Sequence, residues 1–164
     1  MSSKFNRNEK REKNLPLIVA GASLELPTDI LTIRCKFNFH YFNKHCAGQD
    51  FKQWEYEELI KLLENLTLFS ENSLTYWKNQ NSRLVIYDNF PIPAKTDFKE
   101  PRNVPLEAKW GRFRLGGKIR LIGFVIPETY DNKEHETTGK RWDINTFYIV
   151  FLDENHRFWH DEDE

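Results

Sequence analysis

Residues 109–126 alternate between cationic and apolar side chains on both sides of a Gly-Gly pair, and this run constrains the fold more than any other. Successive residues of a strand point to opposite faces, so the alternation predicts two strands, with Gly116-Gly117 as the tight turn between them. The run therefore predicts a β-hairpin rich in positive charge. Its cations are Lys109, Arg112, Arg114, Lys118 and Arg120.

Three further segments have the pattern of strands. Residues 146–152 are apolar on both alternating faces, which is typical of a central strand. Residues 31–42 alternate strictly, and we expect Cys35, Phe37 and Phe39 to be buried and Lys36 and His40 to be exposed. Residues 83–87 predict a shorter strand.

Two helices are expected between these strands. In residues 50–66 apolar side chains recur at helical spacing, with Asp50 as N-cap and Gln53 completing a capping box. A shorter helix is expected to start at Ser70. Four prolines within residues 88–108 exclude a central strand or a helix there and predict a long loop. The order of elements predicts an α+β fold, a mainly antiparallel sheet with two helices packed on one face.

The length of 164 residues suffices for one domain with a substantial core, and 15% of the residues are aromatic. We expect a disordered basic tail at residues 1–14, a single α+β domain at residues 15–160 and an acidic tail at residues 161–164. The basic start is either a solvated tail or an arm that contacts nucleic acid.

The sequence predicts a cytoplasmic protein. Its N-terminal residues show no apolar signal core, and no apolar run approaches the roughly 18 to 20 residues that span a bilayer, so we expect no membrane partner. The two cysteines, Cys35 and Cys46, form no CxxC motif and fit free thiols in a reducing compartment.

The hairpin cations are the strongest functional signal. Arg112 and Arg114 share one face of the first arm, Lys118 and Arg120 share one face of the second, and both pairs can lie on the same face. Clustered like charges are unfavourable unless an anion screens them, and arginine forks match phosphate oxygens. Lys109 would extend this surface. The alternative is an exposed face whose cations serve solubility or guard an edge strand.

An aromatic residue and two residues beyond the last strand complete the candidate site. Trp110 lies next to the cations and either stacks a nucleotide base or packs in the core. His156 has the chemistry of a general acid or base, and Arg157 that of a group stabilising charge on phosphorus. The alternative is structural, an Asx turn at Asp153 and Asn155.

Other chemistry has little support in the sequence. There is no HExxH motif, no phosphate-binding GxxxxGK[ST] loop and no GxGxxG fingerprint. We therefore predict no metal site and no cofactor.

The hairpin, with Ile119-Arg120, and a final strand that closes on His156-Arg157-Phe158-Trp159 resemble the small RelE/ParE-type toxin fold. The resemblance covers residues 50–80 and 109–160. It implies a cytoplasmic RNA-directed protein, a metal-independent endoribonuclease that uses attack by the ribose 2′-hydroxyl. Arg120, Arg114 and Arg157 would hold phosphate and His156 would move the proton. RNA or the ribosome, and an antitoxin, are the partners that the resemblance implies.

A hypothesis of another class stands beside this one. The chain would be a non-catalytic binding or accessory protein of a mobile-element or phage-defence locus. The same basic face, or the aromatic-rich surface, would then hold a protein or nucleic-acid partner.

Overall fold

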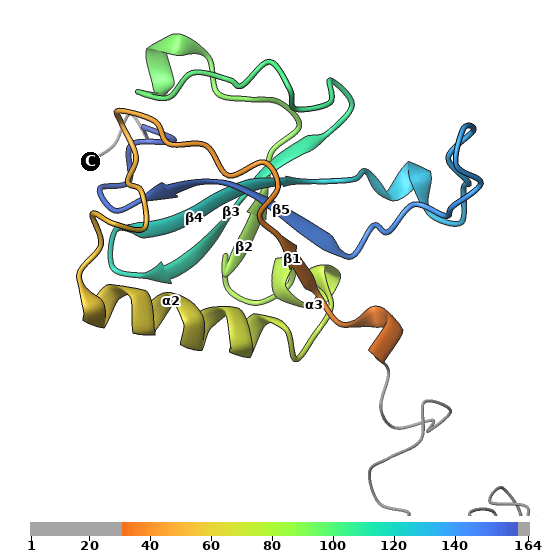
Figure 1. The fold of residues 1–164 in the computed structure, drawn as a ribbon, viewed down its shortest axis with the longest axis horizontal. Helices are drawn as coiled ribbons and strands as arrows, with labels where there is room; N and C mark the ends of the chain where they lie inside the picture. The colour runs from red at the N-terminus through yellow and green to blue at the C-terminus, as the bar shows by residue number, and fades with distance from the viewer. Residues whose placement is uncertain (1–30, 161–164) are drawn as a thin grey trace, which may run out of the picture. The chain divides into compact units, whose positions relative to one another are not determined.

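The computed structural model describes residues 31–160 (Figure 1). Contacts within the chain divide it into residues 1–32 and residues 33–164. Of the first unit only Leu31 and Thr32 are described, within the 3₁₀ helix η2 (Leu31–Ile33). The predicted tails, and the predicted start of the domain at residue 15, lie outside the described residues.

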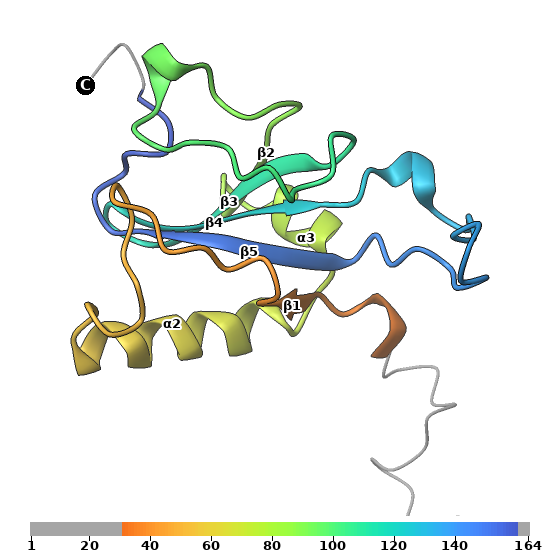
Figure 2. The ribbon, with the colours of Figure 1, turned by 45° about the horizontal axis from the view of Figure 1, so that its top comes forward.

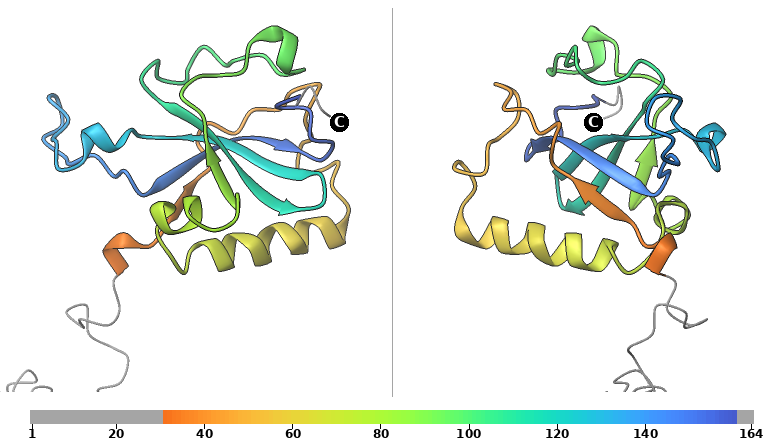
Figure 3. Two further views of the ribbon diagram at one scale, coloured as in Figure 1. Left: turned by 180° about the vertical axis from the view of Figure 1, so that it is seen from behind. Right: turned by 45° about the vertical axis from the view of Figure 1, so that its right-hand side comes forward.

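Residues 33–160 contain a five-stranded sheet with two α-helices, which confirms the predicted α+β class. The strand order is β1-β5-β4-β3-β2, and every neighbouring pair is antiparallel except β1 and β5, which are parallel. The strands are β1 (Lys36–Asn38), β2 (Leu84–Ile86), β3 (Lys109–Gly116), β4 (Ile119–Val125) and β5 (Thr146–Asp153). The helices are α2 (Tyr56–Phe69) and α3 (Leu74–Lys78), and they cover one face of the sheet, as Figures 1 and 3 show.

The predicted hairpin is β3 and β4. Its turn residues Gly116 and Gly117 both have positive φ, 141° and 49°, which side chains other than glycine rarely adopt. Arg114 and Arg120 lie directly opposite each other across the two strands. The alternation that predicted the hairpin thus holds from Lys109 to Arg114 and along β4, with a register shift between Arg114 and Gly116 next to the turn.

Each face of the sheet has its own apolar core. Phe113, Leu121 and Phe147 face the helices and pack with residues of both, including Phe69 of α2. Trp110, Phe124 and Phe151 belong to the opposite core. That second core is closed by the loop of residues 88–108, which lies across this face in Figure 2, and by the segment after β5. We refer to the two sides as the helix face and the loop face.

The loop of residues 88–108 contains one 3₁₀ turn, η3 (Pro93–Lys95), and no strand or α-helix, as its prolines predicted. Phe98 is buried in the core of the loop face and Phe90 packs against it, whereas Ile92 is exposed. The loop therefore has a structural role as the cover of that core.

The strand predicted over residues 31–42 is much shorter than expected. Cys35 is buried and Lys36 and His40 are exposed as predicted, but Phe39 is 42% exposed, which corrects its expected burial. The chain turns after β1, where the Phe42 N–H donates to the Phe39 carbonyl at 3.0 Å and the His40 N–H to Asn38 Oδ1 at 2.9 Å. These local hydrogen bonds replace the pairing that would have extended the strand.

Both helices begin later than predicted. Only one of the two predicted capping contacts forms, Asp50 N–H to Gln53 Oε1 at 2.8 Å, because the Gln53 N–H donates to the Asp50 backbone carbonyl at 2.9 Å, and these contacts close a separate turn. The capping box of α2 is instead formed by Glu55 and Glu58. Ser73 caps α3 by accepting from the Tyr76 N–H. Neither helix, nor any other within residues 31–160, has the length and apolar character needed to cross a bilayer.

The two cysteines are expected to differ sharply in reactivity. Cys35 is 3% exposed, and burial raises the pKa of its thiol to about 12, so almost no thiolate is present at pH 8. Cys46 is exposed. With a disulfide reagent at pH 8 we expect one thiol to react within minutes and the other only after denaturant is added. Fast reaction of two thiols in the native protein would contradict the position of Cys35.

Candidate phosphate-binding site

Three arginines meet on the loop face, at the end of the sheet where the hairpin turns. Arg112 and Arg114 lie on the same side of β3 as the buried Trp110, and Arg120 lies opposite Arg114 on β4. The Arg114 N–H donates to the Arg83 carbonyl at 2.9 Å, so a fourth arginine borders the group. We call Arg112, Arg114 and Arg120 the arginine cluster.

Arg120 is the buried member of the cluster. It is 4% exposed, and its Nη1 donates to the carbonyls of Gly117 at 2.7 Å and Ile119 at 2.9 Å. Burial and then the charges of Arg112 and Arg114 together lower the pKa of Arg120 to about 10, which shows that the guanidinium groups repel one another. Arg120 nevertheless remains a cation at neutral pH.

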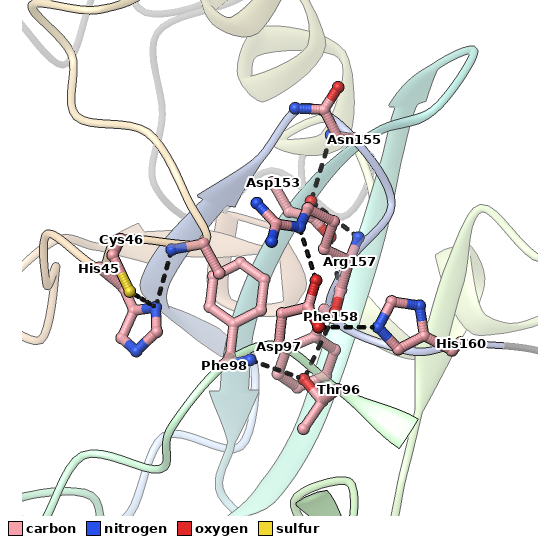
Figure 4. Close-up of polar contacts among 11 residues, drawn as sticks. His45, Cys46, Thr96, Asp97, Phe98, Asp153, Asn155, Arg157, Phe158 and His160 are labelled. Atoms are coloured by element: carbon pink, nitrogen blue, oxygen red, sulfur yellow. Dashed lines mark hydrogen bonds and ion pairs between the residues drawn. The ribbon is translucent and has the colours of Figure 1, made fainter. Parts of the chain in front are cut away.

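The nearest carboxylate, Asp153, is already occupied. It is fully buried at the end of β5, opposite Arg120. Its Oδ1 accepts from the N–H groups of Asn155 at 3.2 Å and Arg157 at 3.0 Å, and its Oδ2 accepts from Phe158 at 2.9 Å (Figure 4). The Asx turn at Asp153 and Asn155, which was the structural alternative to a catalytic role for this segment, is therefore present. Because this single carboxylate is shared among three backbone donors, the arginine cluster keeps a net positive charge.

Two guanidinium nitrogens of the cluster have no acceptor. The Nε atoms of Arg112 and Arg120 are buried, and neither hydrogen-bonds to any described residue. A buried donor without a partner costs about 1 to 3 kcal/mol. This unmet hydrogen-bonding capacity, together with the mutual repulsion, is what an anion with several oxygens would satisfy.

His156 joins the cluster from the segment after β5. Its Nε2 lies 2.6 Å from Arg112 Nη1, and because a guanidinium can only donate, this ring nitrogen is the acceptor and carries no proton. His156 also has a positive φ of 58°, a strained conformation that persists where its surroundings impose it. The backbone thus holds the imidazole against Arg112.

Three of the predicted cations lie apart from the cluster. Arg157 Nε donates to Asp97 Oδ2 at 2.6 Å, so its guanidinium engages the loop of residues 88–108 (Figure 4). His160 Nε2 lies 3.2 Å from the other oxygen of the same carboxylate. Lys109, at the other end of β3, pairs with Asp88 at 2.9 Å. Lys118 is exposed in the hairpin turn.

Asp97 gives the loop a pH-dependent anchor. Hydrogen bonds from Arg157 and then His160 hold the pKa of Asp97 below its usual value, so the stability that it contributes is complete above about pH 4 and is lost as the pH falls through the lowered pKa. We expect Asp97→Asn to cost about 1 kcal/mol or less at pH 7, because the pair is exposed. In urea denaturation near pH 2, the difference in stability between Asp97→Asn and wild type should vanish. A difference in stability that is the same at pH 2 and pH 7 would contradict this prediction.

Trp110 does not have the predicted exposure. Its ring is 1% exposed and its Nε1 donates to Glu100 Oε1 at 3.1 Å, so it cannot stack a base from solution. Tyr87 and Trp159 form a partly exposed stacked pair instead, with centroids 4.6 Å apart and planes 5° apart. Tyr87 also acts electrostatically on Arg120, which places the pair beside the cluster. The sequence signal that could have identified Tyr87 was its position at the end of the strand predicted for residues 83–87.

No protein-family model, curated protein sequence or solved structure matches this chain. Within residues 31–160 no three His, Cys, Asp or Glu side chains gather in a way that could hold a metal ion. Function is therefore inferred from the geometry of the arginine cluster and its neighbours.

Proposed function

We propose that this chain is an RNA-directed protein that holds phosphate groups on the arginine cluster. The observation that carries the proposal is the pair of buried Nε donors without acceptors on Arg112 and Arg120, within a group of three cations. Phosphate supplies several oxygens and negative charge at once, and arginine binds it with paired hydrogen bonds. Arg114, which is exposed, is the member that first meets the ligand.

The stacked pair of Tyr87 and Trp159 favours a single-stranded ligand. Unpaired bases stack on aromatic side chains, and proteins that recognise single strands combine such rings with cations along the backbone. The rings and the arginines lie on the same face of the sheet. A strand with its phosphates at the cluster can therefore place a base on Trp159.

Binding is tested by fluorescence anisotropy with a labelled single-stranded RNA. We expect saturable binding that weakens with salt, and Trp159→Ala should weaken it about tenfold, because base stacking on a ring contributes about 1 to 3 kcal/mol. Trp142→Ala is the matched control, since that ring packs on Tyr130 in the segment of residues 127–142. No binding, or equal losses in the two variants, would count against the proposal.

A second candidate function is cleavage of the bound RNA, the activity that the RelE-like resemblance implies. It is favoured by the unprotonated Nε2 of His156 next to the cluster. His156 would take the proton of a ribose 2′-hydroxyl while its oxygen attacks phosphorus. The 5′-oxygen would leave and take a proton from water, giving a 2′,3′-cyclic phosphate and a 5′-hydroxyl. Arg112 and Arg120 would stabilise the charge on phosphorus, and Arg157 would need to release Asp97 to take part.

His156→Gln separates cleavage from binding. Glutamine retains hydrogen bonding with Arg112 but cannot accept a proton near neutral pH, so cleavage should fall by roughly 10²-fold or more while RNA affinity and the melting temperature stay close to wild type. Cleavage is followed on end-labelled RNA, with and without ribosomes. If pure wild-type protein leaves the RNA intact in both cases, the catalytic version is wrong. The binding or accessory role, with a nucleic-acid or protein partner on the same face, then remains.

A further inference from the structure

A groove of about 510 Å³ lies on the helix face, between the start of α2 and the turn of the β3–β4 hairpin. Figure 1 shows this turn extending over the first half of α2. The volume is within the range of sites for small organic ligands. The residues that line the groove are Trp54, Glu58, Lys61, Leu62, Leu115, Gly116, Gly117, Lys118 and Ile119.

The groove combines apolar walls with a shortage of acceptors. Its walls come from Trp54 and Leu62 on the helix side and from Leu115 and Ile119 on the hairpin. Three carbonyls of the lining residues already accept hydrogen bonds. Asn65 Nδ2 donates to the Leu115 carbonyl at 3.3 Å, and Arg120 donates to those of Gly117 and Ile119.

The lining residues supply donors that have no partner. Trp54 is 5% exposed, and its Nε1 is buried without an acceptor among the described residues. Lys61 and Lys118 are exposed, and no described carboxylate pairs with either of them. Donors without acceptors around apolar walls are complementary to a ligand that carries oxygen acceptors on an apolar body.

Glu58 is the one acidic residue that lines the groove, and its carboxylate is turned toward other groups. Its Oε2 accepts from the Glu55 N–H at 3.2 Å in the capping box of α2. It also hydrogen-bonds Glu154, whose pKa is raised by burial and then by the charge of Glu58. The two lysines therefore leave the groove with one net positive charge.

We propose that this groove binds a small organic carboxylate with an apolar body, such as an alkyl or aryl acid. The body packs on Trp54, Leu62 and Ile119, and the carboxylate lies between Lys61 and Lys118. Trp54 supplies a buried N–H for which a carboxylate oxygen is the missing acceptor. The groove is on the opposite face of the sheet from the arginine cluster, so this inference does not depend on RNA binding.

Decanoate, below the concentration at which it forms micelles, is the probe. Affinity is measured by calorimetry and location by the indole ¹H–¹⁵N signal of Trp54, assigned by its loss in Trp54→Phe. We expect decanoate to bind with saturation and to shift this signal. Acetate lacks the apolar body and decylammonium has the wrong charge, so neither should saturate in the same range. Failure of decanoate to shift the Trp54 signal, or equal binding of decylammonium, would overturn the proposal.

Three variants test the donors. Trp54→Phe retains an aromatic ring without the N–H, and Lys61→Gln and Lys118→Gln remove one charge each. Each should weaken decanoate binding at least fivefold. The melting temperature should stay close to wild type in the two lysine variants, whereas Trp54→Phe lowers it because the ring is buried in the core of the helix face. Lys78→Gln, on α3, is the matched control because Lys78 lies 3.6 Å from Glu128 outside the groove, and it should change nothing. Unchanged affinity in both lysine variants would remove the carboxylate from the proposal.

Discussion

Asp153→Ala is expected to lower the free energy of unfolding by about 3 to 5 kcal/mol. The carboxylate is fully buried and accepts from the backbone N–H groups of Asn155, Arg157 and Phe158. Its removal leaves these donors without a partner, and lost hydrogen bonds to a buried charged group are among the most destabilising changes known. It also leaves Arg120 without the carboxylate whose charge raises its pKa. Urea denaturation followed by tryptophan fluorescence measures the loss.

The neighbouring carboxylate supplies the control for this change. Glu154 is more exposed, and its charge lies against those of Glu58 and Glu55, so Glu154→Ala should be neutral or slightly stabilising. Its backbone N–H donates to Gln49 Oε1, a contact that the substitution leaves in place. A loss below about 1 kcal/mol for Asp153→Ala would mean that the turn after β5 is held by something other than this carboxylate.

The double change Arg112→Gln/Arg114→Gln is expected to weaken binding to single-stranded RNA by roughly 10- to 100-fold, the effect of losing two charge-assisted contacts. Glutamine retains much of the side-chain length, and both arginines are partly or fully exposed, so the fold should persist. Arg120 is left unchanged because its hydrogen bonds to Gly117 and Ile119 hold the hairpin turn. The affinity is measured by anisotropy at a fixed salt concentration.

A matched control removes charge without touching the cluster. Arg141 is an exposed arginine in the segment of residues 127–142. In the sequence this segment follows β4, whereas the hairpin turn precedes β4. Arg141→Gln lowers the net charge by one unit and should change RNA affinity less than threefold. If Arg141→Gln loses as much RNA affinity as each arginine of the cluster does, binding reflects general electrostatic attraction and not a specific site.

The parts of the fold that sequence reasoning predicted are those set by local pattern. The hairpin of β3 and β4 and the central strand β5 follow from alternation and from the turn preference of Gly116-Gly117, and both are present. The strand at residues 31–42 was overestimated because alternation does not reveal where a chain stops pairing. Its end at Asn38 is set by turn hydrogen bonds and by the single neighbour β5.

The predicted helix boundaries were wrong for a related reason. Asp50 and Gln53 have the capping pattern and make one of its two contacts, yet Glu55 and Glu58 cap the helix that forms. The buried ring of Trp54 lies between the two turns and packs in the core of the helix face. Tertiary packing thus selected between two local signals that the sequence offers at nearly equal strength.

The candidate site was predicted in part. Spacing by two along each arm placed the three arginines of the cluster on one face, which is where they lie. Arg157 was grouped with them by its neighbourhood to His156, but its partner Asp97 is 60 residues away in sequence. Trp110 was a candidate because it adjoins cations, although alternation alone could not say that the loop of residues 88–108 covers its face. Contacts of this kind depend on long-range packing.

The proposal that the arginine cluster holds RNA phosphates predicts how the binding of single-stranded RNA depends on salt. Affinity for single-stranded RNA is measured for wild type and Arg112→Gln/Arg114→Gln across a series of potassium chloride concentrations. Each phosphate contact contributes about 0.7 to the slope of log K against log salt, so the variant should have a slope shallower by about 1.4. Arg141→Gln should parallel wild type. Identical slopes for wild type and the double variant would contradict the claim, even if their affinities differed.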